Sequence, residues 1–578
     1  MSAPTTRGAE APASGELSHK QIMTILSGLM LGMFLAALDQ TIVSTAIRTI
    51  GDDLNGLSVQ AWVTTAFLIT STISTPLFGK LSDIYGRKPF YMLAITIFIV
   101  GSALCGLAQN MYMLAAFRAF QGIGAGGIMP LALAIIGDII PPRERAKYQG
   151  YFMAVFATSS VLGPVVGGFF AGQSSILGAP GWRWIFYINV PIGIFALFVV
   201  TRVLHLDHTR REHRIDWTGA AMLVVGLVPL LIIAEQGRTW GWASTSAYIC
   251  YLLGAVGLVA FIRVEARMGD EALLPLRLFR RSVFATGSAQ ALIVGMGMFG
   301  GIASIPLYLQ IVKGASPTKA GLLLLPLVAG MMLASLASGQ YTSRTGRYKI
   351  FPVVGSVLMV IGIALMTRIG ADTPLWQTDI YMALFGMGLG MNMQSIVLAM
   401  QNSVDPRDMG VATSAVTFFR QVGGSLGTAV FLSILFTRAA TNIPREYARA
   451  RATPDFQQAA AAHPDQVALL NHGGSLNDTS FIKGLDNALA HPFLVGFSDA
   501  MDTVFLVGAL VLVVGVVLSA MMKEVPLRSV SGQQARAAAE HADEPATTSA
   551  ASAAAAAAPA DVAPLASGAQ PARGGTES

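Results

Sequence analysis

The stretch "GKLSDIYGRKPFYML", from Gly79 to Leu93, decides how the whole chain is interpreted. It sets one carboxylate, one glycine and two adjacent cations in a short polar gap between two long apolar runs. A glycine such as Gly86 adopts positive φ without a steric penalty, so the chain can reverse direction within a few residues. Asp83 can accept hydrogen bonds from the free N–H groups at the start of a neighbouring helix, where the dipole favours an anion. We therefore expect a charged hinge between two apolar helices.

Composition indicates what surrounds this hinge. Of 578 residues, 53% are hydrophobic and only 12% are charged, and the mean hydropathy is +0.58. A soluble domain carries roughly a quarter charged residues, so these values favour the bilayer as solvent. Apolar runs of about 20 residues, the length that crosses the hydrocarbon core, recur about fourteen times between residues 22 and 522. The sequence predicts an all-α integral membrane protein with fourteen transmembrane helices.

The Lys and Arg residues lie mainly on one side of the predicted membrane. Loops that follow even-numbered spans carry clusters such as 80–88, 143–147 and 277–281, whereas the opposite loops hold fewer cations. By the positive-inside rule, the even-numbered loops and both termini are cytoplasmic. The net charge of +6 therefore orients the chain, and we expect no nucleic-acid partner.

The hinge sequence recurs in weaker form later in the chain. "GQYTSRTGRYK" begins at Gly339, with a serine in the place of Asp83. The offset of 260 residues from Gly79 to Gly339 nearly equals the 264 residues from Gly122 to Gly386. Because the two hinges follow spans two and ten, the repeat predicts six helices, two inserted helices and six more. The predicted organisation is a cytoplasmic tail (1–21), an N-terminal six-helix bundle (22–204), two inserted helices with flanking loops (205–283), a C-terminal six-helix bundle (284–525) that includes an external loop (438–500), and a disordered cytoplasmic tail (526–578).

The tails and the external loop differ in composition. Both tails are rich in small and polar residues and cannot bury enough apolar surface to fold. The loop contains "EYARARATPDFQQAAAAHPDQVALL", whose composition favours short interfacial or protruding helices.

No feature of the sequence indicates a cofactor, a metal site or an enzyme. Cys105 and Cys250 both fall within predicted spans, and the eight histidines lack ligand spacing. There is no nucleophile paired with a base, and no Gly-x-x-x-x-Gly-Lys-(Ser/Thr) loop that would support an ATP pump.

From about Ile22 to Val525 the chain resembles the fourteen-helix drug:proton antiporters of the major facilitator superfamily. The resemblance rests on ordered motifs: the hinge, "LDQTIVSTAIRTIGDDL" in span one, "RAFQGIGAG" in span four, "GPVVGG" in span five, "WRWIFYINVPIG" and "FFRQVGGSLGTA". The span-one motif departs from the family at Ser44, where Asn is usual, and at Arg48, where Pro is usual. Ser159, four residues before "GPVVGG", stands at a position where the family more commonly has glycine.

The resemblance implies that the hinge is a cytoplasmic latch, closed in one state and broken in the other. In this family the carboxylate meets a helix of the other bundle, and the arginine meets an acid at the inner end of span four, here Asp138. The expected latch residues are Gly79, Asp83, Gly86, Arg87, Lys88 and Asp138. The alternative is that the hinge cations only fix topology.

Ionisable residues inside predicted spans are candidates for proton coupling, because an unpaired charge there costs several kcal/mol. Burial favours the protonated form of Asp39, so this residue could take and release a proton; alternatively it only hydrogen-bonds a neighbouring helix. Arg118 cannot discharge, so it would tune an acid or hold a polar network, whereas Gln121 would have a transport or structural role. Glu235, near the outer end of span seven, would bind protons or substrate, or reach interfacial water. Arg420 would have a structural or a transport role.

Span five carries the motif typical of antiporters. Its residues are Gly150, Gly163, Pro164, Gly167 and Gly168, which let a helix bend and approach another closely. The resemblance implies that this motif closes the transport path in one state, whereas helix packing alone is the simpler interpretation.

Together these features favour a proton-coupled antiporter that exports amphiphilic or cationic drugs from the cytoplasm or inner leaflet. The alternative is export of one endogenous lipid, siderophore or antibiotic; a non-transporting receptor is a third hypothesis. We expect a monomer in the cytoplasmic membrane of a bacterium, with small-molecule substrates, protons and the lipid bilayer as its partners.

Overall fold

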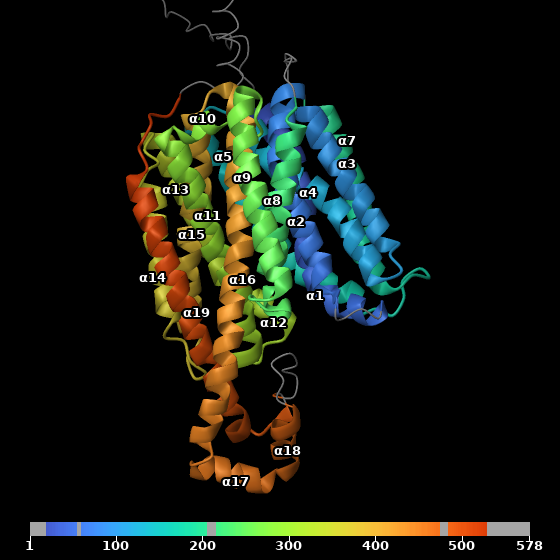
Figure 1. The fold of residues 1–578 in the computed structure, drawn as a ribbon, viewed down its shortest axis with the longest axis vertical. Coiled ribbons are helices and arrows are strands. Elements are labelled where there is room, and N and C mark those ends of the chain that lie inside the picture. The colour runs from blue at the N-terminus through green and yellow to red at the C-terminus, as the bar shows by residue number, and fades with distance from the viewer. Residues whose placement is uncertain (1–18, 55–58, 205–214, 474–481, 483, 529–578) are drawn as a thin grey trace, which may run out of the picture.

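The computed structural model describes residues 19–54, 59–204, 215–473, 482 and 484–528, and all regular elements among them are helical. The predicted all-α class is therefore confirmed for this part of the chain. Almost the whole of both predicted tails lies outside the described residues. Figure 1 shows long, roughly parallel helices with a narrower arm at one end.

The first bundle is built around α4. It packs on α2 and α3, while α1 packs on α5 and α7. Three glycines allow the close approach of α4: a Cβ at Gly122, Gly124 or Gly126 would lie 2.5 Å or less from a backbone carbonyl oxygen of α2 or α3. The elements are α1 (His19–Asp53), α2 (Ala61–Tyr85), α3 (Arg87–Gly106), α4 (Met111–Ile139), α5 (Pro142–Ala171), η2 (Gly181–Arg183), α6 (Trp184–Tyr187) and α7 (Asn189–Val203).

Two further helices, α8 (Trp217–Trp240) and α9 (Thr245–Met268), pack on each other after the first bundle. Both begin at capping residues: Asp216 accepts a hydrogen bond from the Gly219 N–H, and Ser244 accepts one from the Ala247 N–H. α8 also contacts α2 of the first bundle and α16 of the second. The short elements η3 (Gly269–Glu271) and α10 (Leu276–Phe279) then lead to the second bundle.

The second bundle repeats the plan of the first. α15 packs on α13 and α14, and α16 packs on α11 and α19. The two bundles meet where α2 contacts α16 and where α5 contacts α13. The elements are α11 (Ser282–Leu307), η4 (Tyr308–Val312), α12 (Pro317–Leu323), α13 (Leu325–Thr345), α14 (Ile350–Met366), α15 (Leu375–Ser403), η5 (Pro406–Asp408), α16 (Met409–Ala450), α17 (Pro454–Ala462), α18 (Pro464–Gly473) and α19 (Asn487–Met521).

Twelve helices of the described residues are long and apolar enough to cross a membrane. α14 is a shorter apolar helix of 17 residues, and α2, with 25 residues, is packed between α4 and α16. With these two, the set reaches the fourteen helices that the apolar runs predict.

The segment predicted as an external loop, 438–500, differs most from a simple connection. α16 continues through it to Ala450, so its 42 residues extend about 63 Å, twice the roughly 30 Å of a hydrocarbon core. The helix continues because Leu435, Ala439 and Ile443 recur every four residues and are buried. Figure 1 shows the resulting arm, with α17 and α18 at its tip.

Candidate functional site

The centre of the first bundle contains a buried ion pair. Asp39 on α1 and Arg118 on α4 are 0% and 1% exposed, and their Oδ2 and Nη1 atoms lie 2.6 Å apart. The other carboxylate oxygen, Oδ1, accepts hydrogen bonds from Gln121 Nε2 at 3.0 Å and Asn189 Nδ2 at 2.8 Å. Helices α1, α4 and α7 thus converge on one carboxylate, and the predicted residues Asp39, Arg118 and Gln121 lie together.

Further contacts hold the partners of this carboxylate in place. Arg118 Nη1 also donates to Gln121 Oε1 at 2.8 Å, and the guanidinium lies over the Phe67 ring at 4.0 Å. Asn189 Nδ2 also donates to Ser102 Oγ at 2.9 Å. The sequence reasoning did not single out Asn189 or Ser102; a polar residue within an apolar span was the signal available for each.

Hydrogen-bond donors surround the Asp39 carboxylate. Three donors contact the carboxylate, one of them the positively charged guanidinium of Arg118, and Asp39 is the only counter-charge of Arg118 within this network. A buried charge without a partner costs several kcal/mol. Loss of either charged partner would therefore leave the other charge buried and uncompensated.

Glu235 stands apart from this network. It lies on α8, its side chain is exposed, and it is beside Thr65 of α2. No hydrogen bond joins it to Asp39 or Arg118 in the described part of the chain. Arg420 lies on α16 and is 8% exposed.

The hinge residues connect the two bundles. Asp83 accepts hydrogen bonds from the N–H groups of Gly410 at 3.1 Å and Val411 at 2.9 Å, in the first turn of α16. Arg87 contacts both Asp83, at 2.5 Å, and Asp138, at 2.8 Å. An anion thus caps a helix start in the opposite bundle, where the dipole favours it.

Gly86 and Gly79 allow the turn and the helix contact at the hinge, whereas Lys88 contacts only its own bundle. Gly86 has φ 102°, as a sharp reversal between α2 and α3 demands. A Cβ at Gly79 would lie 2.2 Å from Ser414 Oγ, so this glycine permits the close approach of α2 and α16. Lys88 donates to the Thr201 carbonyl at 2.9 Å, within its own bundle, so it does not contribute to the closure.

Contacts that the sequence reasoning missed also close this end of the molecule. Arg143 of α5 donates to the carbonyls of Ser343 and Arg344, both at 3.0 Å, at the C-terminal end of α13. Arg145 is buried and bonds Gln401 of α15. At the second hinge, where a serine replaces the acid, an arginine and helix-end carbonyls thus make the contact between bundles.

The span-five motif contacts α1 through two of its members. A Cβ at Gly163 would lie 2.1 Å from Thr41 Oγ1, and one at Gly167 would lie 2.2 Å from Thr45 Oγ1. A Cβ at Gly168 would meet no atom within 4 Å. Pro164 lies beside α12, where a Cβ at Gly321 would be 3.5 Å from its ring, and Gly150 lies within α5.

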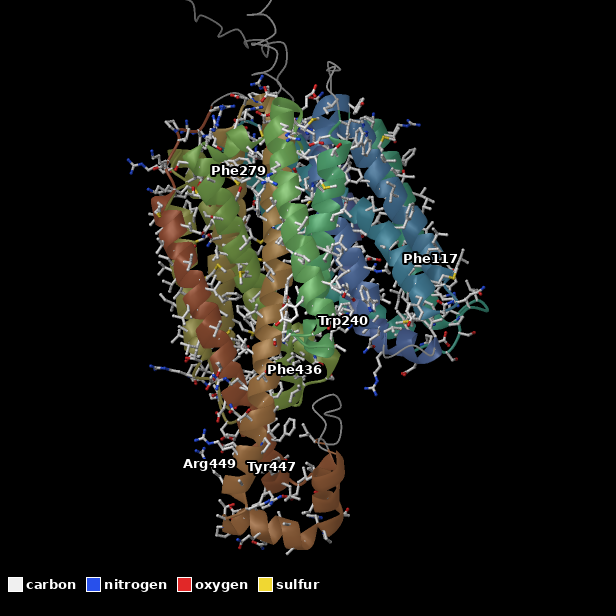
Figure 2. The ribbon with its side chains drawn as sticks, viewed as in Figure 1. Phe117, Trp240, Phe279, Phe436, Tyr447 and Arg449 are labelled. Atoms are coloured by element: carbon white, nitrogen blue, oxygen red, sulfur yellow. The ribbon has the colours of Figure 1, made fainter. Side chains whose placement is uncertain are left out.

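Figure 2 shows Tyr447 and Arg449 within the arm, near the end of α16. Tyr447 donates to the Leu489 carbonyl at 3.1 Å, which ties α16 to α19. Its ring packs against Phe456 of α17 with centroids 6.2 Å apart. The arm is therefore a packed helical element with its own apolar contacts.

Comparison with known proteins adds an independent finding. Residues 29–428 match the family model described as Major Facilitator Superfamily. An uncharacterized MFS-type transporter of Mycobacterium tuberculosis (strain ATCC 25618 / H37Rv) is 37% identical over 530 residues, 91% of this chain and 73% of its own. The multidrug transporter protein MdtP of Bacillus subtilis (strain 168) is 34% identical over 512 residues, 87% of this chain and 93% of its own. Among solved structures, a bacterial homolog of the human lysosomal transporter Spinster, inward-facing and unoccupied, gives a TM-score of 0.53 at 17% identity, covering 88% of this chain and 100% of that one.

Proposed function

Because the chain belongs to the Major Facilitator Superfamily, we propose that it is a proton-coupled antiporter that exports amphiphilic or cationic compounds by alternating access. Substrate leaves the cytoplasm or the inner leaflet while protons enter, as the two bundles rock about a site near the midplane. The protein acts as a monomer in a bacterial cytoplasmic membrane with both termini inside.

The observation that carries this proposal is the ion pair of Asp39 and Arg118. An acid buried in a span, held by three donors, is costly to keep and is a functional site by default. Because loss of its charge leaves Arg118 without a counter-ion, proton binding changes the relative stability of two conformations of the first bundle. Binding of a proton is thereby linked to the position of α1 against α4.

The second support is the closed hinge end. The contacts of Asp83 with α16 and of Arg143 with α13 stabilise a state in which the cytoplasmic path is shut. Substrate loading from inside requires these contacts to break, and proton binding at Asp39 supplies part of the free energy difference between the two states.

The substrate class rests on the named relatives. MdtP is named as a multidrug transporter, and a chain 37% identical over 408 residues, also from Bacillus subtilis (strain 168), is named "Multidrug resistance protein 3". The arm favours the second candidate function, export of one endogenous lipid, siderophore or antibiotic, because it extends well beyond the membrane-spanning part of α16 and could pass cargo to an envelope component.

The test is ethidium accumulation in inverted membrane vesicles that contain the protein. An imposed gradient, acid inside, is expected to drive dye into the vesicles, and nigericin, which dissipates that gradient, is expected to abolish uptake. Vesicles without the protein provide the control. Uptake that persists after nigericin would contradict proton coupling, and absence of uptake by correctly inserted protein would turn the search to an endogenous lipid or metabolite.

A further inference from the structure

Arg420 differs from every other arginine that is at least nine-tenths buried in the described residues. Arg87 pairs with Asp83 and Asp138, Arg118 pairs with Asp39, and Arg145 bonds Gln401 and two carbonyls. Arg420 is 8% exposed, makes no hydrogen bond or ion pair within the described chain, and has no charged neighbour.

The position of Arg420 excludes the usual ways of relieving such a charge. It lies eleven residues after the start of α16, about 16 Å along the helix and close to the middle of a hydrocarbon core of roughly 30 Å. A side chain at that depth cannot reach a headgroup layer by extending along the helix. A guanidinium also stays charged under physiological conditions.

Arg420 lies where α16 packs on α11 of its own bundle, next to a residue that contacts the other bundle. A Cβ at Gly295 of α11 would lie 2.2 Å from the Arg420 carbonyl oxygen, so α11 crosses α16 at this residue. The next residue, Gln421, accepts a hydrogen bond from Thr75 of α2, in the other bundle, at 3.4 Å. Arg420 therefore lies on the helix that moves against α2 when the bundles rock.

The guanidinium is not completely enclosed by the described residues. None of its nitrogen atoms is among the completely buried unpaired atoms of the described residues, although the residue as a whole is more than nine-tenths buried. Each nitrogen is therefore accessible to a water-sized probe. The result is a cation with five N–H donors and no partner among the described residues, on a helix that also contacts α2 of the other bundle.

We propose that Arg420 binds an anionic group, a carboxylate or a phosphate, of the transported molecule. This inference rests on the proposed export function and extends its substrate class to amphiphiles that carry a negative charge, alone or beside a positive one. A guanidinium recognises both oxyanions through two parallel hydrogen bonds, and a site shielded from water strengthens them. The anion supplies the counter-charge that the described residues do not.

The test is equilibrium binding to purified protein in nanodiscs. Fluorescein, an amphiphilic carboxylate, and ethidium, a cation, are titrated against wild type, Arg420→Gln, Arg420→Lys and the control Arg368→Gln, which removes an exposed arginine. We expect Arg420→Gln to weaken fluorescein binding about tenfold or more, as loss of a charge-assisted pair implies, and to leave ethidium binding unchanged or tighter. Arg420→Lys should be intermediate, and Arg368→Gln should match wild type.

The source of the anion is distinguished by the nanodisc lipid. Displacement of fluorescein by phosphatidylglycerol but not by phosphatidylcholine identifies a lipid headgroup as the occupant; equal binding in both lipids identifies a free organic anion. Fluorescein binding that does not depend on Arg420, or equal loss of both dyes, would overturn the proposal. These binding measurements need no proton gradient. Failure of the anion-binding proposal can therefore be distinguished from failure of the proposed export function.

Stability provides a second readout. A charge kept for binding destabilises the empty protein, so Arg420→Gln should unfold at an equal or higher temperature than wild type without ligand. Unfolding at a clearly lower temperature would show that Arg420 holds the bundle together, and the proposal would fail.

Discussion

At the scale of residues, the ion pair of Asp39 and Arg118 shows how far motifs alone can reach. The sequence predicted Asp39 and Arg118, because a charged residue inside an apolar run stands out, and it indicated Gln121 through the motif "RAFQGIGAG". It did not predict Asn189 as the fourth member, since that contact depends on where α7 packs against α1 and α3. Short motifs identify charged residues whose burial costs free energy, whereas the partners of these residues are set by tertiary packing.

Removal of one member of this pair should be more harmful to stability than removal of both. Asp39→Leu leaves Arg118 charged and buried, and we expect a loss of about 3–5 kcal/mol. Replacing the pair by Asp39→Leu with Arg118→Met should restore most of this loss, because apolar side chains of similar volume need no counter-charge. Thermal unfolding in detergent measures both. A double variant as unstable as the sum of the two single variants would contradict the account.

At the scale of elements, the span-five motif separates into two groups of residues. The sequence grouped Gly163, Gly167 and Gly168 together, but helix geometry does not. Gly163 and Gly167 are four residues apart and share the face that meets α1, whereas Gly168 is about 100° further round the helix and faces open space. The same geometry explains why α16 passes the predicted loop boundary at 438: its buried residues keep helical spacing against α19.

Alanine substitutions should therefore divide this motif. Gly163→Ala and Gly167→Ala place a methyl group against Thr41 and Thr45, with an expected loss of about 1–3 kcal/mol. Gly168→Ala meets no atom, so stability should be unchanged or slightly improved. Melting temperatures of the three variants provide the measurement. Equal effects at all three positions would show that the motif acts by another route.

At the scale of the whole molecule, charged side chains that bind helix ends hold the two bundles together at the hinge end: Asp83 binds the start of α16, and Arg143 binds the end of α13. The sequence predicted that Asp83 can cap a neighbouring helix start, and the resemblance to the family implied that this helix belongs to the other bundle. It could not predict the contact of Arg143 with the end of α13, because every residue has a backbone carbonyl and the acceptors therefore cannot be recognised from residue type. The fourteen-helix plan and its repeat were readable because the bilayer imposes long apolar runs.

Weakening the hinge should open this end of the molecule. Asp83→Asn removes the charge that caps α16 and pairs with Arg87, which is worth up to about 2 kcal/mol in a partly buried setting. Spin labels on cysteines at Glu144 and Thr345, with Cys250 replaced by alanine, would report the separation of the bundles. Relative to wild type, we expect a larger long-distance population for Asp83→Asn. We expect no increase for Lys88→Gln, because Lys88 contacts only its own bundle. Identical distance distributions in the two variants would contradict the latch.

The most direct test of proton coupling compares two modes of transport by Asp39→Asn in vesicles, with Asp39→Glu as the matched control. Exchange of ethidium across the membrane without a gradient needs the conformational cycle only, whereas accumulation against a gradient also needs a proton site. We predict that Asp39→Asn keeps exchange but loses accumulation driven by an acid interior, and that Asp39→Glu retains part of both. Accumulation by Asp39→Asn equal to wild type would show that the proton binds elsewhere.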